Sequence, residues 1–178
     1  WNRELPAAQI RKSTPLRQLG WIRIEPGLVL VEVQLLPSDV GTQLPRNLRI
    51  MVDPNMELVT TSHNAGQFQT LETTANRRTL LARTDGDRLR LRFRLTDRSG
   101  IAELSLPRIE VENSRIVQNW WGCTVHPSLS FERKVGRDFP SLDPAVFSDD
   151  WGTPSTPPTF SVSIPSSSTD WRMRTYAR

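Results

Sequence analysis

The stretch Arg88-Leu89-Arg90-Leu91-Arg92-Phe93-Arg94-Leu95 alternates basic and apolar side chains over eight positions. Successive side chains of a β-strand point to opposite faces, whereas a helix returns to the same face about every 3.6 residues. The alternation therefore predicts a strand whose leucines and phenylalanine face a core. The opposite face carries four arginines, which we name the arginine ladder: Arg88, Arg90, Arg92 and Arg94.

Comparable strand-like runs begin near Trp21 and continue along the chain. Clusters of Pro, Gly, Asn and Asp separate them, as is typical between strands. Asp85-Gly86 has the composition of a two-residue hairpin turn, so we expect 77–83 to pair with the ladder strand. The apolar positions change parity across Pro107, which predicts a bulge or an edge break there. The predicted strands cover 28–36, 47–52, 56–61, 77–83, 88–95, 101–112, 115–121, 123–132, 160–164 and 171–176.

Many short strands with frequent turns and little helical spacing predict an all-β fold. We expect an antiparallel β-sandwich of Greek-key or jelly-roll type, with a closed barrel as the alternative. Parallel strands need long crossovers, usually helical, and no segment provides such a helix. Residues 1–20 carry two prolines and little periodicity, so they are predicted to form an N-terminal arm or linker. Residues 21–178 then form one domain, with loop-like residues at 133–158 and a Ser/Thr/Pro-rich segment at 152–170.

The composition sets further bounds on the class of protein. A length of 178 residues suits about one domain, and the single cysteine, Cys123, excludes an internal disulfide framework. No run approaches the roughly 20 apolar residues of a membrane-spanning helix. The net charge is +4, and all 23 basic residues except Lys12 and Lys134 are arginines. Arginine grips carboxylate or phosphate with two hydrogen bonds, so this bias is compatible with an anionic partner.

The arginine ladder has two interpretations. Its side chains repeat every ~6.6–6.8 Å along one face, close to the spacing of phosphates in a nucleic-acid strand. The ladder could therefore bind an anion. Alternatively, the arginines form a lattice of ion pairs with carboxylates on neighbouring strands. No aromatic residue interrupts the exposed face to stack on bases, so nucleic acid is a disfavoured partner. The carboxylates considered for the lattice are Glu32, Glu103, Glu110 and Glu112.

Trp120 and Trp121 are neighbours in a predicted strand, so their rings should point to opposite faces. One ring can then join the core. The other is either covered by a loop or exposed as a flat platform for a sugar ring or a protein partner. Both tryptophans are therefore candidate ligand-binding residues.

The remaining chemistry-bearing residues give weak signals. Cys123 and His126 lie three positions apart and should point to opposite faces, which argues against a nucleophile–base pair and favours a structural, buried cysteine. With His63 as the only other histidine, a zinc site is disfavoured. Asp149 and Asp150, in a predicted loop, are weak calcium candidates. No catalytic residue and no cofactor is predicted.

We therefore expect a non-catalytic β-sandwich module of a larger, exported protein, serving as a scaffold or protein-interaction domain. Its partner would be another protein or neighbouring domains of the same chain. The first alternative is a carbohydrate-binding sandwich that uses an exposed tryptophan. Polyanion binding through the arginine ladder and an unrecognised enzyme are lesser alternatives. The start at Trp1 instead of methionine favours a fragment, and the sequence leaves the compartment open, with an exported or cell-surface location favoured.

Overall fold

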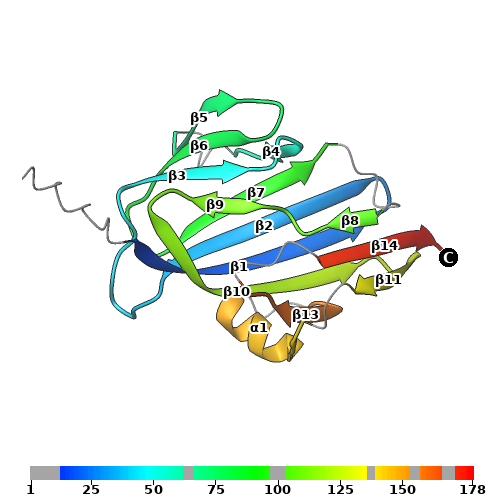
Figure 1. Cartoon of the computed structure of the whole chain (residues 1–178). Helices are drawn as coiled ribbons and strands as arrows, with labels where there is room; N and C mark the ends of the chain where they lie inside the picture. The colour runs from blue at the N-terminus through cyan, green and yellow to red at the C-terminus, as the bar shows by residue number, and fades with distance from the viewer. Residues whose placement is uncertain (1–12, 62–65, 97–102, 136–138, 153–156, 166–170) are drawn as a thin grey trace, which may run out of the picture.

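The computed structural model describes residues 13–61, 66–96, 103–135, 139–152, 157–165 and 171–178, which form three β-sheets and one short helix, α1 (Pro144–Trp151) (Figure 1). The large sheet has the strand order β12 (Ser141–Leu142), β13 (Phe160–Ser163), β10 (Ser114–Val125), β1 (Thr14–Glu25), β2 (Leu28–Pro37), β7 (Leu89–Leu95), β4 (Met56–Leu58). A second sheet has the order β5 (Phe68–Thr73), β6 (Arg78–Arg83), β3 (Asn47–Val52), β9 (Ile109–Val111). The third has the order β11 (Leu129–Val135), β14 (Trp171–Ala177), β8 (Glu103–Ser105).

The two smaller sheets together cover one face of the large sheet, and Figure 1 shows them in front of it. Val31 of β2, Ile50 of β3 and Met173 of β14 are fully buried in one apolar cluster between these layers. The large sheet ends at β12 on one side and at β4 on the other, so it is not a closed barrel. The predicted all-β sandwich is confirmed. We call the covered face of the large sheet its inner face and the opposite face its outer face.

The ladder strand forms as predicted. Leu89, Leu91, Phe93 and Leu95 of β7 are buried, whereas the intervening arginines are exposed on the outer face. Burying a leucine or phenylalanine side chain contributes about 1.5–3 kcal/mol, so β7 is fixed in register by its apolar side.

The large sheet is not purely antiparallel, because β1 and β10 pair in parallel from Thr14 beside Ser114 to Ile24 beside Val125. The expectation that parallel pairing would require a crossover helix is wrong here. Strands of the two smaller sheets, together with β2, β4 and β7, make up the connection between β1 and β10. This connection is long enough to return the chain in the same direction without a helix.

One predicted pairing is wrong and one predicted break is confirmed. β6 and β7 do not form a hairpin, because β6 lies in the second sheet and β7 in the large sheet. The turn at Asp85-Gly86 passes between the layers, and Gly86 does not adopt the left-handed conformation that a hairpin turn of this type needs. The break at Pro107 is confirmed, and its cause is a change of sheet: β8 joins the third sheet and β9 the second.

Three of the predicted boundaries are wrong. The strands predicted at 115–121 and 123–132 divide after Val125 instead, because β10 is continuous to Val125 and β11 begins at Leu129. Residues 14–20, assigned to the N-terminal arm, belong to β1 in the middle of the large sheet, since the proline at position 15 is accommodated near the start of the strand. The loop predicted at 133–158 contains the end of β11, the short β12 and α1. The predicted strands at 160–164 and 171–176 correspond to β13 and β14. The turn predicted at 97–100 lies outside the described residues.

Candidate functional site

The outer face of the large sheet is divided into an apolar half and a charged half. On β1, the side chains of Leu19 and Trp21 point outward and form a second apolar cluster with Phe147 and Trp151 of α1. Strands β2 and β7 present Glu32, Gln34, Arg90 and Arg92 on the same face. The helix therefore covers only part of the outer face, and its last residue lies at the boundary between the two halves.

Two glycines of the large sheet leave room for large aromatic rings close to the backbone. Gly20 pairs with Trp121, and Trp21 pairs with Gly122, in the parallel register of β1 and β10. A Cβ atom added at Gly20 would lie 2.3 Å from the Trp121 ring, and one added at Gly122 would lie 2.6 Å from the ring of Phe147. Both distances are far shorter than van der Waals contact. Gly20 thus makes room on the inner face and Gly122 on the outer face, where Phe147 anchors the helix.

Capping residues define both ends of α1. The Asp143 carboxylate accepts a hydrogen bond from the Ala145 N–H at 2.8 Å, and Pro144 occupies the first turn, where its missing N–H is tolerated. Gly152 follows in a left-handed conformation (φ 80°) and donates its N–H to the carbonyls of Ser148 and Asp149. The pair Phe147 and Trp151, four residues apart, faces the sheet. The two caps and this apolar pair are the sequence signals of α1, which is too short to show extended helical periodicity.

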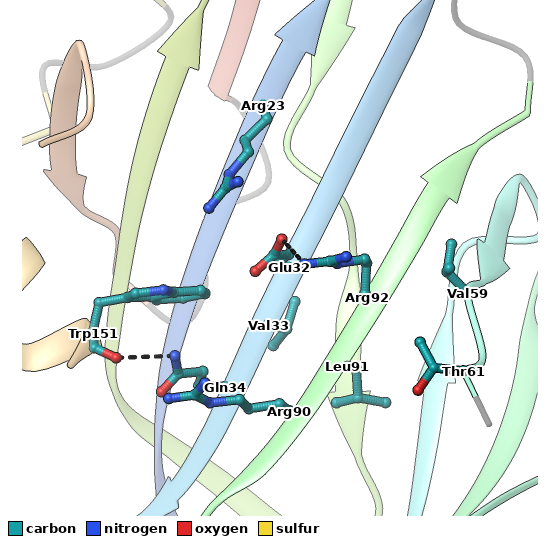
Figure 2. A pocket seen from close by; sticks show the side chains of 10 residues that line it. All are labelled: Arg23, Glu32, Val33, Gln34, Val59, Thr61, Arg90, Leu91, Arg92 and Trp151. Carbon is teal, nitrogen blue, oxygen red and sulfur yellow. Dashed lines mark hydrogen bonds and ion pairs between the residues drawn. The ribbon is translucent and has the colours of Figure 1, made fainter. Parts of the chain in front are cut away.

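A groove of about 380 Å³ lies on the charged half, beside the end of α1 (Figure 2). We name it the arginine groove. Its floor is formed by β2 and β7, one wall by Trp151 and the other by Val59 and Thr61, which follow β4. Arg23 of β1 reaches into it from the same side as Trp151. The groove is lined by Arg23, Glu32, Val33, Gln34, Val59, Thr61, Arg90, Leu91, Arg92 and Trp151.

The charges of the groove do not balance. Glu32 lies opposite Arg92 in the β2–β7 register, and its Oε1 lies 2.8 Å from Arg92 Nη2. Half of the Arg92 side chain (51%) stays exposed, against 16% for Glu32. None of the ion pairs among the described residues involves Arg90, and Arg23 stacks over the Trp21 ring at 5.0 Å. Three arginines and one carboxylate thus line the groove, which leaves an excess of positive charge.

Gln34 forms a buried polar contact at the floor of the groove. Its side chain is 1% exposed, and its Nε2 donates a hydrogen bond to the Trp151 carbonyl at 3.1 Å. The same carbonyl accepts a hydrogen bond from Arg88 Nη1 at 3.3 Å. The Gln34 Oε1 is buried without a hydrogen-bond partner among the described residues. These contacts attach the end of the helix to the floor and leave one acceptor unsatisfied.

The ion-pair lattice predicted for the ladder forms at only one of the four carboxylates considered. Glu32 pairs with Arg92, as described. The other three belong to strands of the smaller sheets or their ends, in the opposite layer, and pair there with other arginines. Glu103 lies 3.4 Å from Arg172, Glu110 lies 3.9 Å from Arg108, and Glu112 lies 3.6 Å from Arg49.

The two adjacent tryptophans point to opposite faces, as predicted. Trp121 is 2% exposed in the inner core, and its Nε1 donates to Asn119 Oδ1 at 2.7 Å, so its ring is not an open platform. Trp120 is half-buried on the outer face against the α1 cluster. It lines a separate hollow of about 500 Å³ together with Pro140 and Ile164. Of these two tryptophans, only Trp120 has a partly exposed side chain.

The other candidate residues lie apart from one another. Cys123 is buried in the inner core, which confirms its structural placement, and His126 lies at the surface with Nδ1 2.7 Å from Ser128 Oγ. The Asp150 carboxylate pairs with the Arg17 guanidinium, while Asp149 is exposed on α1. Within the described ranges, no three His, Cys, Asp or Glu side chains are grouped closely enough to hold a metal ion. His63 lies outside the described residues.

No protein-family model matches this sequence, and a search of curated proteins gave no match either. In the described part of the chain, no helix has the length and apolar character needed to cross a membrane. The fold and the site geometry therefore carry the functional argument.

Proposed function

We propose that this chain is a non-catalytic β-sandwich module that binds a partner through an anionic group, held in the arginine groove. The observation that carries the proposal is the surplus of guanidinium groups there: Arg23, Arg90 and Arg92 line the groove, and Glu32 is the one carboxylate in its lining. A lattice that only stabilised the sheet would pair these charges across β2 and β7. Instead, Arg90 lies opposite the neutral Gln34.

Arginine chemistry supports an anionic ligand. Each guanidinium has five N–H donors in a fixed fork and accepts no hydrogen bond, so it suits carboxylate, sulfate or phosphate oxygens. The ion pair with Glu32 orients Arg92 while leaving most of its donors available. A concave site lined by one sign of charge also concentrates oppositely charged ligands near its walls.

The unsatisfied oxygen of Gln34 adds a second requirement, a hydrogen-bond donor on the ligand. A buried acceptor without a partner costs roughly 1–3 kcal/mol. Arg90 lies opposite Gln34 on the neighbouring strand, and the two side chains lie side by side on the groove floor (Figure 2). A ligand whose anionic group binds the Arg90 guanidinium would draw that side chain away from Gln34. An N–H or O–H donor beside the anionic group would then pair with the Gln34 oxygen.

The test is a binding assay with three labelled anions: polyglutamate, a heparin octasaccharide and a single-stranded oligonucleotide. We expect at least one of them to bind the wild-type chain at low salt and more weakly as salt rises. The double charge reversal Arg90→Glu with Arg92→Glu should weaken that binding by at least about tenfold. The proposal is wrong if no anion binds.

The matched control is the double reversal Arg46→Glu with Arg83→Glu, two exposed arginines of the opposite layer near the ends of β3 and β6. It changes the net charge by the same amount. If the control weakens binding as much as the groove variant, net charge explains the binding and the groove does not.

A second candidate function is carbohydrate binding at Trp120, because this ring borders the hollow with Pro140 and Ile164. An indole ring offers a flat apolar surface for a sugar. This candidate depends on the hollow and is independent of the arginine groove.

A further inference from the structure

We infer that the partner presents an extended acidic peptide with a carboxylate at every second residue, which lies lengthwise in the arginine groove along β7. This inference rests on the proposed function and specifies the class of ligand.

The shape of the groove favours an elongated ligand. Met56 and Leu58 of β4 pair with β7, and the Val59 N–H donates to the Arg92 carbonyl at 2.8 Å, so the chain from β4 to Val59 follows the edge of β7. The opposite wall is Trp151, at the end of α1. The two walls flank β2 and β7 on either side (Figure 2). A ligand therefore has room parallel to the strands, whereas the walls limit its width.

The spacing of the arginines favours a peptide in strand conformation. Arginines two residues apart on β7 repeat every ~6.6–6.8 Å, and so do alternate side chains of any extended peptide. Carboxylates at every second position of a bound peptide can therefore meet Arg90 and Arg92 inside the groove without bending the peptide. Arg88 and Arg94, exposed in the same row just beyond them, can meet the next carboxylate on either side. Opposite charges that face each other at this spacing attract, which aligns the ligand lengthwise with β7.

The buried rings argue against the other polyanions. Proteins that bind single-stranded nucleic acid stack bases on aromatic side chains, and sugars also use flat rings. Trp151, the ring that lines the groove, is 3% exposed, and Trp21 beside Arg23 is buried as well. An acidic peptide needs no such platform, because guanidinium–carboxylate contacts supply its attraction.

The experiment compares two fluorescein-labelled octapeptides of identical composition and charge by anisotropy. One alternates Glu and Thr four times, and the other has four Glu followed by four Thr. In an extended peptide the alternating sequence turns all four carboxylates to one side, whereas the block sequence turns only two. Two additional exposed charge pairs should make the alternating peptide bind about 2- to 30-fold more tightly. The Arg90→Glu/Arg92→Glu variant should lose this preference, and the Arg46→Glu/Arg83→Glu control should keep it.

Other outcomes separate this inference from the proposed function. Equal binding of the two peptides would refute the strand geometry but leave anion binding at the groove intact. Binding of the heparin octasaccharide or of an oligonucleotide without either peptide would identify a different partner and also refute the inference. If none of these anions binds, both the inference and the proposed function are wrong.

Discussion

Replacing Gly122 with alanine tests how α1 is attached to the outer face. The new Cβ atom would lie 2.6 Å from Cε1 of Phe147 and 3.0 Å from its Cδ1. Gly122 sits within β10, so the backbone has little freedom to retreat. The Phe147 ring, which is fully buried against Trp21 and Trp151, has to move instead.

The expected loss of stability follows from overpacking. Inserting a methyl group into a well-packed core typically costs about 1–3 kcal/mol. For a domain of this size each kcal/mol lowers the melting temperature by roughly 2–4 °C. We therefore expect Gly122→Ala to melt about 2–12 °C below the wild-type chain. Gly86→Ala is the matched control, because a Cβ atom at Gly86 has no neighbour within 4 Å.

A double-mutant cycle separates the clash from other effects of the added methyl group. Phe147→Ala alone should cost about 3–5 kcal/mol because it empties a buried site. In the Phe147→Ala background the ring is gone, so the added methyl group should cost almost nothing. The two changes should therefore couple by about 1–3 kcal/mol in urea melts. Additivity within about 0.5 kcal/mol would refute the contact.

Two further variants test the face assignment and the second candidate function. Phe93→Asp should unfold the domain, because it buries an unpaired charge. Arg94→Ser, on the exposed face, should change the midpoint of a thermal melt by less than about 2 °C. Equal tolerance of both substitutions would show that the assignment of inner and outer faces to β7 is wrong. Trp120→Ala should abolish any glycan binding seen in affinity electrophoresis while leaving anion binding unchanged, and glycan binding that persists in this variant would rule out the Trp120 hollow.

The sequence predicted those features of the fold that depend on neighbouring residues, such as the position of a strand and its buried side. The alternation of β7 records which side of the strand is buried, because side-chain direction depends only on the residue's own position. Which strands pair depends on distant parts of the chain. Asp85-Gly86 marks the break between two strands correctly, but its local chemistry does not reveal that these strands belong to different layers. No local sequence feature of β1 or β10 predicts that these two strands pair in parallel either.

The site was predictable only in part. Alternation placed Arg90 and Arg92 on an exposed face, but the residues that complete the groove come from elsewhere in the sequence. Arg23 belongs to β1, and Trp151 ends a helix of eight residues, which is shorter than the windows in which helical periodicity becomes clear. Asp143 and Gly152, which cap that helix, were the available clues to its presence.

The parallel pairing within the large sheet has a consequence during protein synthesis. Thr14 of β1 lies beside Ser114, a hundred residues later in the chain. At about 5–20 residues per second, a ribosome needs roughly 5–20 s to make the second strand after the first. Throughout that interval β1 can pair with β2 on one side, while its other row of amide and carbonyl groups awaits a partner that has not been translated. We therefore expect the nascent chain to be most prone to aggregation until β10, which ends at Val125, has left the ribosome.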